Sequence, residues 1–259
     1  MIQFLVDKTI SVIGAGRLGT AVIDALYEKG HKKIIATRRN EEQLTILKQK
    51  YSGILTTSDN VVGAEQSDIL VLGVKPGFIE EVGQEIQDYT ANKLVISLAA
   101  GKSLDYVNNV FSNARVACVM TGIFVKDEVL GYSLSDNCLE EDEKAIKYIF
   151  GNDAIKLDEE QLPGRTWVAV DTGIIAQEIG TKIQALVSSG MKEEYAAKFY
   201  AGTLRALADA IGSGKTGEEI YLSVAGQKGF TQKMYQKMLE KGHFDLLKEC
   251  VEETLKKLK

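Results

Sequence analysis

The sequence predicts an α/β domain over residues 1–160, followed by an all-helical domain over residues 161–259. Up to about residue 158, short apolar runs rich in β-branched residues alternate with amphipathic helical patterns, which is typical of a parallel sheet joined by helices. From Pro163 onward, apolar residues recur at helical spacing and no convincing strand follows. A chain of 259 residues is long enough for two ordinary domains of these sizes.

The individual elements follow from the same two patterns. We expect strands over residues 10–13, 33–37, 53–57, 67–74, 93–98, 115–120, 129–133 and 154–157. Helices between these strands are expected over residues 17–29, 41–51, 78–89 and 140–150. In the second domain, glycines separate the helices expected over residues 166–188, 192–211, 218–225, 231–241 and 243–258.

Composition argues against several classes of protein. A net charge of -5, without a basic run interleaved with aromatic residues, argues against a general nucleic-acid binder. No apolar stretch approaches the roughly 18 residues of a transmembrane helix, and the opening MIQFLVDK lacks the basic leader of a signal peptide. The widely spaced Cys118, Cys138 and Cys250 favour a reducing compartment and no metal site. We therefore expect a cytoplasmic enzyme without a membrane partner.

A glycine-rich turn joins the first expected strand to the first helix. The spacing of Gly14, Gly16 and Gly19 suits a dinucleotide: the first glycine makes the turn, the second lets the backbone approach a pyrophosphate, and the third lets the helix pack on the strand. Similar turns occur in unrelated loops, but a second strand within about 30 residues supports the assignment. The phosphates are expected at the helix N-terminus. We therefore assign cofactor binding to Gly14, Ala15, Gly16, Arg17, Leu18 and Gly19.

The second expected strand ends in Thr37, Arg38 and Arg39. An NAD enzyme places an acidic residue here for the ribose 2′-hydroxyl. Two guanidinium groups and a hydroxyl instead suit a 2′-phosphate, which they can grip through forked hydrogen bonds. We therefore expect NADPH to be preferred over NADH. Alternatively, both arginines are ordinary solvated charges at the start of a helix.

Two further loops follow expected strands at their carboxyl ends, where ligands bind in parallel sheets. One is Val74, Lys75 and Pro76, where proline prevents further strand pairing. The other is Ala99, Ala100 and Gly101, whose small side chains let a cofactor approach closely. Both loops are therefore assigned to the cofactor site.

These motifs, in this order, resemble the pyrroline-5-carboxylate reductases. The resemblance covers nearly the full chain and also includes Arg115-Val116 with Met120-Thr121, Gly229-Phe230-Thr231 and Leu239-Glu240-Lys241-Gly242-His243-Phe244. It implies a Rossmann domain followed by a helical dimerisation domain whose long helices interleave in a homodimer or a dimer-based higher oligomer. It also implies NAD(P)H-dependent reduction of a cyclic imine, pyrroline-5-carboxylate, to proline, a step of proline biosynthesis.

The sequence departs from this family where the family holds substrate. After Met120-Thr121 the family usually continues with Asn-Thr-Pro, whereas this chain has Gly122-Ile123-Phe124. The family's Gly-Pro-Ala-Tyr is here Asp171-Thr172-Gly173-Ile174, and its Pro-Gly-Gly-x-Thr-Thr turn is the segment from Gln227 to Gln232. Another imine, a keto substrate or a non-catalytic NADPH-binding role therefore remain alternatives.

Substrate binding is expected at two segments. One is Met120, Thr121 and Gly122, and the other is Lys228, Gly229, Phe230 and Thr231. The second segment opens a helix whose free N–H groups can hold a substrate carboxylate, to which Lys228 adds positive charge. Thr231 is expected to hydrogen-bond the ring nitrogen of the substrate, or alternatively to be a plain N-cap.

Asp171 is the expected proton donor to that nitrogen. It falls in the first turns of the helix expected over residues 166–188, among Val168, Val170 and Ile174, where burial would favour a protonated carboxyl. Related imine reductases resemble this arrangement in using an acidic or tyrosine donor there. Alternatively, Asp171 only complements the positive end of the helix dipole.

Overall fold

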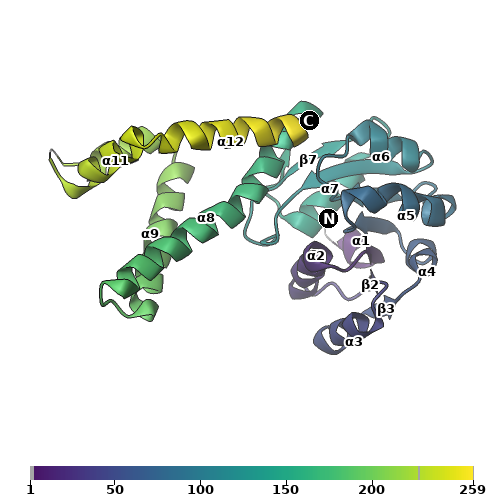
Figure 1. The fold of residues 1–259 in the computed structure, drawn as a ribbon. Helices are drawn as coiled ribbons and strands as arrows, with labels where there is room; N and C mark the ends of the chain where they lie inside the picture. Colours follow the sequence, from purple (N-terminus) through teal and green to yellow (C-terminus); the bar gives the residue numbers. More distant parts are fainter. Residues whose placement is uncertain (1–2, 227, 259) are drawn as a thin grey trace. The chain divides into compact units, whose positions relative to one another are not determined.

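Across the residues that the computed structural model describes, 3–226 and 228–258, the strands form one eight-stranded sheet (Figure 1). The strand order is β3-β2-β1-β4-β5-β6-β7-β8, and every neighbouring pair is parallel except β6 and β7. The strands are β1 (Ile10–Ile13), β2 (Ile34–Thr37), β3 (Leu55–Thr57), β4 (Ile69–Leu72), β5 (Leu94–Ser97), β6 (Arg115–Met120), β7 (Gly131–Leu134) and β8 (Ile155–Lys156). The order reverses between β1 and β4, which opens a crevice at their carboxyl ends.

Helices cover both faces of this sheet and explain its continuous apolar strands. The four residues of β1, β4 and β5 are all buried, as expected of strands packed on two sides. One core joins the sheet to α2, α3 and α7, and the other joins it to α4, α5 and α6. The helices are α1 (Gln3–Val6), α2 (Arg17–Glu28), α3 (Glu41–Lys50), α4 (Asn60–Glu65), α5 (Ile79–Ile86), α6 (Leu104–Val110) and α7 (Glu140–Phe150).

The expected α/β fold class is confirmed, with corrections to several elements. The short helices α1, α4 and α6 were not expected, because segments of four to seven residues contain too little helical periodicity to recognise. The helix expected over residues 78–89 is split into the 3₁₀ turn η1 (Pro76–Phe78), α5 and a second 3₁₀ turn, η2 (Gln87–Tyr89). The resulting architecture is a Rossmann domain followed by helices.

The helical part consists of α8 (Leu162–Ser188), α9 (Glu193–Gly212), α10 (Gly217–Val224), α11 (Phe230–Glu240) and α12 (His243–Leu258). Helix α8 begins four residues before the expected start, because the 3₁₀ turn η3 (Glu159–Gln161), capped by Asp158, leads directly into it. Pro163 is tolerated in the first helical turn, where its missing N–H has no intrahelical partner to lose. None of the described helices is long and apolar enough to cross a membrane.

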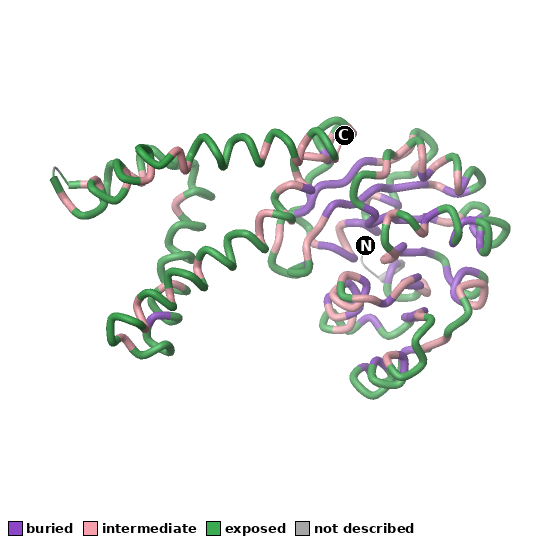
Figure 2. The backbone as a smooth tube through the Cα atoms, in the orientation of Figure 1, coloured by how far each residue is buried: buried purple, intermediate pink, exposed green. Residues whose placement is uncertain are grey.

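Contacts divide the chain into two units, one running to Val170 with the last residues of α12, and the other spanning Asp171–Lys256. The two units differ in burial (Figure 2). In the first, the strands are buried nearly throughout. In the second, Ala196 is the one buried residue among those described. The second unit therefore contains almost no hydrophobic core of its own.

Candidate functional site

Three glycines shape the turn between β1 and α2, each for a different reason. Gly14 has φ +89°, and a Cβ there would lie 2.6 Å from Cγ1 of Val74. A Cβ on Gly19 would lie 2.5 Å from the carbonyl oxygen of Gly14, so the helix can approach the strand only without a side chain. A Cβ on Gly16 would meet no atom within 4 Å. Gly16 therefore leaves open space beside its backbone, where a ligand can approach.

A chain of hydrogen bonds to residues of β2, α4 and α5 holds this turn in place. The N–H groups of Gly14 and Ala15 donate to the carbonyl oxygen of Thr37, at 3.1 and 2.7 Å. The Thr37 hydroxyl also accepts from the Gly14 N–H and donates to Oδ1 of Asn60, at 3.2 and 2.6 Å. Nδ2 of Asn60 in turn donates to Glu85, at 2.7 Å. Thr37 is fully buried, so it organises the turn and does not line the cavity beside it.

That cavity has a volume of about 740 Å³ and lies at the carboxyl ends of β1, β2 and β4. It is lined by Gly14, Gly16, Arg38, Arg39, Asn40, Ser58, Asp59, Asn60, Val61, Gly73, Val74, Lys75, Phe78, Glu81, Val82 and Glu85. The structure thus brings together the glycine turn, both arginines and the loop after β4, as the sequence predicts. Pro76 follows as the first residue of η1.

The two arginines are held differently. Nη1 of Arg38 donates to the Ala15 carbonyl oxygen at 2.8 Å, which ties this half-buried side chain to the glycine turn. Arg39 is exposed, and its guanidinium lies 5.0 Å from the ring centre of Phe78 and 3.4 Å from Glu81. Arg39 is therefore the more accessible of the two cations.

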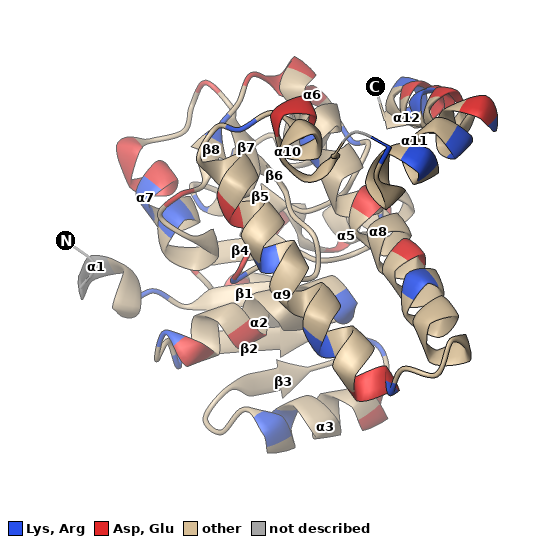
Figure 3. Ribbon diagram, turned by 90° about the vertical axis from the view of Figure 1, so that its left-hand side faces the viewer, with Lys and Arg blue, Asp and Glu red and all other residues tan. Residues whose placement is uncertain are grey.

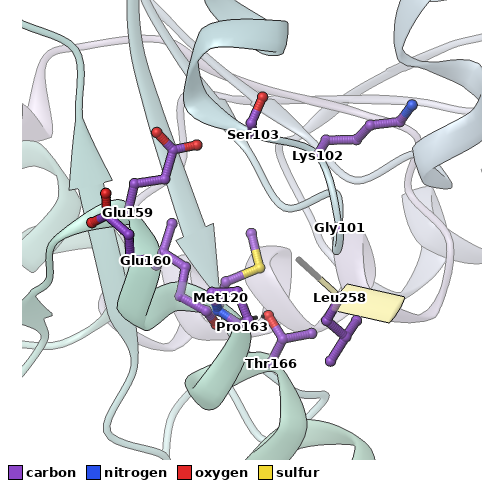
Figure 4. A pocket seen from close by; sticks show the side chains of 10 residues that line it. Gly101, Lys102, Ser103, Met120, Glu159, Glu160, Pro163, Thr166 and Leu258 are labelled. Carbon is purple, nitrogen blue, oxygen red and sulfur yellow. Dashed lines mark hydrogen bonds between the residues drawn. The ribbon is translucent and has the colours of Figure 1, made fainter. Parts of the chain in front are cut away.

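A second cavity, of about 340 Å³, lies beside the loop after β5 (Figure 4). It is lined by Gly101, Lys102, Ser103, Met120, Glu159, Glu160, Leu162, Pro163, Thr166 and Leu258. Gly101 has φ +70° and Ala99 is buried, whereas Ala100 is exposed. The carboxylate of Glu159 accepts the N–H of Leu104 at 2.6 Å and so caps α6. The small-residue loop and Met120 thus contribute to one hollow.

The loop after β6 is held by an ion pair that the sequence analysis did not identify. Glu128 accepts the N–H groups of Gly122 and Phe124, at 3.0 and 3.2 Å, and forms an ion pair with Arg165 of α8. Arg165 also donates from Nε to the carbonyl oxygen of Val129 at 2.9 Å. The side chains of Glu128 and Arg165 are 18% and 11% exposed. This nearly buried ion pair therefore holds both ends of the loop in place, at Gly122 and Phe124 and at Val129.

Gly122 and Glu128 fit one another closely. A Cβ on Gly122 would lie 2.5 Å from Oε1 of Glu128, so the asparagine usual at this position in the family would displace the carboxylate. Ile123 and Phe124, at the tip of the same loop, are 57% and 51% exposed. The absence of a side chain at Gly122 thus leaves room for the carboxylate of Glu128 six residues later.

The remaining candidate residues belong to the helical unit. Because α8 begins at Leu162, Asp171 lies in the third helical turn, beyond the reach of the N-terminal dipole. The explanation that Asp171 only complements the helix dipole is therefore wrong. Val168, Val170 and Ile174 are exposed in this chain and do not bury the carboxyl.

The substrate segment at α11 also differs from expectation in detail. The N-cap is Gly229, and Thr231 is the second helical residue, so the alternative that Thr231 is a plain N-cap is wrong. Lys228 has φ +57°, and its N–H donates to Oε1 of Gln232 at 2.7 Å. Phe230 is 91% exposed, and Gln227 lies outside the described residues.

Other ionisable groups near the sheet do not offer acid–base chemistry. Burial raises the pKa of the Cys118 thiol to about 12, so it stays protonated. Burial also lowers the pKa of His31, which lies at the amino end of the sheet with Nδ1 3.0 Å from the hydroxyl of Tyr148. These two residues are therefore structural.

Comparison with known proteins is consistent with this geometry. Residues 9–101 match a family model described as NADP oxidoreductase coenzyme F420-dependent, and this region includes the glycine turn and the loops after β4 and β5. Pyrroline-5-carboxylate reductase 2 of Bacillus subtilis is 26% identical over 261 residues, which cover 96% of this chain and 94% of that protein. Pyrroline-5-carboxylate reductase of Methanosarcina acetivorans is 35% identical over 151 residues, 56% of each chain.

The fold is likewise shared with solved structures. The pyrroline carboxylate reductase of Plasmodium falciparum, solved with NADP bound, superposes with a TM-score of 0.86 over 97% of each chain at 19% identity. The sequence similarity to a pyrroline-5-carboxylate reductase extends over nearly the whole chain, and the family model covers about the first third of it. The chain is thus similar in sequence and in fold to pyrroline-5-carboxylate reductases.

Proposed function

We propose that the chain is an NADPH-dependent oxidoreductase that reduces the C=N bond of a cyclic imine, with pyrroline-5-carboxylate, reduced to proline, as its substrate. The observation that carries this proposal is the open space beside Gly16 in a turn whose other two glycines are closely packed. A pyrophosphate can approach the backbone at that point and lie at the N-terminus of α2. Full-length relatives named pyrroline-5-carboxylate reductases support the choice of substrate.

The residues around the larger cavity suit a phosphorylated dinucleotide. The turn from Gly14 to Gly19 would hold the pyrophosphate, and Arg38 and Arg39 would face the adenosine ribose. The loops 74–76 and 99–101, which contribute Val74 and Lys75 to the first cavity and Gly101 to the second, would contact the rest of the coenzyme. NADPH, when bound, supplies a hydride for the imine carbon. The chain positions the reactants and excludes water, which is the main demand of such a transfer.

The substrate residues of the proposal are two separate segments of the chain. One is Met120, Thr121 and Gly122, and in the other the first turn of α11, with Lys228 just before it, would offer N–H groups and a positive charge to a substrate carboxylate. Thr231 would hydrogen-bond the ring nitrogen, and Asp171 would protonate that nitrogen, so that hydride addition to the imine carbon completes the amine. A protonated imine is already electrophilic, so no further strong acid is needed.

A direct assay tests the reaction. The purified chain should oxidise NADPH in the presence of pyrroline-5-carboxylate and release proline, measured by the loss of reduced-nicotinamide absorbance and by product analysis. A panel of other cyclic imines and keto acids serves as the comparison. Tight NADPH binding without turnover of any member of the panel would contradict the proposed reaction and favour a non-catalytic role.

The role of Asp171 is tested by the Asp171→Asn variant. We expect kcat to fall by roughly 10²-fold with little change in coenzyme affinity, because the amide cannot donate the proton as an acid does. Glu178→Gln is the matched control, since Glu178 is an exposed acid on the same helix and pairs with Lys182. Unchanged turnover in the Asp171 variant would exclude it as the donor.

We further propose that the chain works as a homodimer in the cytoplasm. The helical unit exposes large apolar side chains on every helix, including Ile174, Phe199, Ile211, Leu222 and Leu246. Charged residues are sparse along α8 and frequent along α12 (Figure 3). Apolar surface of this extent is typical of an obligate interface, and the three unpaired cysteines favour a reducing compartment.

Sedimentation velocity measures the oligomeric state of the chain. The natural chain should sediment as at least a dimer, whereas Ile211→Glu, which places a charge in the exposed apolar surface of α9, should shift it towards monomer. Lys198→Gln, an exposed substitution on the same helix, should leave the dimer intact. A monomeric natural chain at micromolar concentration would contradict the proposal.

A further inference from the structure

The wall of the larger cavity contains as many carboxylates as cations. Arg38, Arg39 and Lys75 line it, but so do Asp59, Glu81 and Glu85. A site built only for an additional phosphate would favour positive charge. The acidic residues on the same wall therefore have to be explained.

Two of these carboxylates already have fixed tasks. Asp59 accepts the N–H of Val61 at 2.8 Å and caps α4. Glu85 accepts from Nδ2 of Asn60, at the end of the hydrogen-bond chain that supports the glycine turn. Glu81 is different, because the contact that the structure gives its carboxylate is Arg39, at 3.4 Å between Nη1 and Oε1.

Arg39 is also the cation most accessible to a ligand. Arg38 donates to the carbonyl oxygen of Ala15, whereas Arg39 is 75% exposed and stacks over Phe78. Glu81, 53% exposed, thus lies beside Arg39, the accessible cation to which a ribose 2′-phosphate could bind. Although Glu81 stands on α5 and not at the end of β2, a carboxylate within reach of the adenosine ribose can also accept a hydrogen bond from an unphosphorylated ribose hydroxyl.

We propose that Glu81 determines coenzyme specificity, by competing with the 2′-phosphate of NADPH for Arg39 and by offering an acceptor to the 2′-hydroxyl of NADH. The inference deepens the proposed function, since it requires that a nicotinamide dinucleotide binds in this cavity. It follows that the chain accepts both coenzymes, with a preference for NADPH that Glu81 reduces.

The test measures binding, so it does not depend on turnover. Dissociation constants for NADPH and NADH are obtained from the fluorescence of the reduced coenzymes with the full chain. Glu81→Gln should raise the NADPH-to-NADH affinity ratio by about two- to tenfold, mainly through tighter NADPH binding, and the change should shrink in 1 M salt because the charges are exposed.

Glu80→Gln is the matched control, since it removes the same charge from the same helical turn but Glu80 does not line this cavity. Arg39→Gln should lower the affinity ratio, and the double variant Arg39→Gln/Glu81→Gln should lose most of the gain that Glu81→Gln gives alone. An equal shift in the Glu80 and Glu81 variants, or no shift in the Glu81 variant, would overturn the inference. A chain that binds both coenzymes but reduces no imine overturns only the proposed reaction.

Discussion

The Gly16→Ala variant is expected to fold as stably as the natural chain and to lose at least about tenfold in NADPH affinity. Gly16 has an extended backbone, with φ -79°, which alanine adopts without strain, and its new Cβ would meet no protein atom within 4 Å. The methyl group would instead occupy the space through which a pyrophosphate approaches the backbone. Coenzyme titration and thermal unfolding of the same preparation separate the two effects.

Gly14→Ala and Gly19→Ala are the contrasting variants. Alanine at Gly14 would be strained at φ +89° and would press on Val74, and alanine at Gly19 would press on the carbonyl oxygen of Gly14. Both should lower the free energy of unfolding, by at least about 1 kcal/mol, as well as coenzyme affinity. If Gly16→Ala binds NADPH as tightly as the natural chain, the turn does not hold the pyrophosphate.

Arg165→Met is expected to lower the free energy of unfolding by about 3 kcal/mol and to raise KM for the imine. Removing the guanidinium leaves the Glu128 carboxylate 18% exposed and without its charged partner, and breaking a nearly buried ion pair from one side is strongly destabilising. The loop from Thr121 to Val129 then loses the contact that fixes it to α8. Urea unfolding and steady-state kinetics measure the two effects.

Lys126→Gln is the matched control for that variant. Lys126 lies on the same loop and pairs with Glu28 at 2.7 Å, but both side chains are exposed, at 41% and 59%. Exposed pairs contribute little to stability, so the control should unfold almost as the natural chain does. Equal unfolding free energies for the Arg165 and Lys126 variants would show that the buried pair does not hold the loop.

Local patterns predicted most of the fold and the cofactor cavity. The apolar runs of β1, β4 and β5 and the glycines at 14, 16 and 19 encode their structure within a few adjacent residues. The antiparallel direction of β7 was not predicted, because a strand's apolar run does not record the direction of its neighbour. Domain limits at residues 160 and 161 remain a prediction.

Contacts between residues that lie far apart in the chain could not be predicted from the sequence. Thr37, Asn60 and Glu85 form one hydrogen-bond chain although each is separated from the next by more than twenty residues, so no spacing rule connects them. Thr37 was assigned to the phosphate for its hydroxyl, but packing buries it and commits that hydroxyl to Asn60. Only the acidic Glu128 near the altered Gly122 offered a local hint, and without the fold it had no partner to suggest its role.

The close fit of Gly122 against Glu128 also limits how this loop can change during evolution. Asparagine at position 122 would push its side chain against the carboxylate end of Glu128, and replacing Glu128 alone would remove the acceptor of two loop amides and the charged partner of Arg165. The effect of a substitution at either position is therefore expected to depend on the residue at the other, which is epistasis.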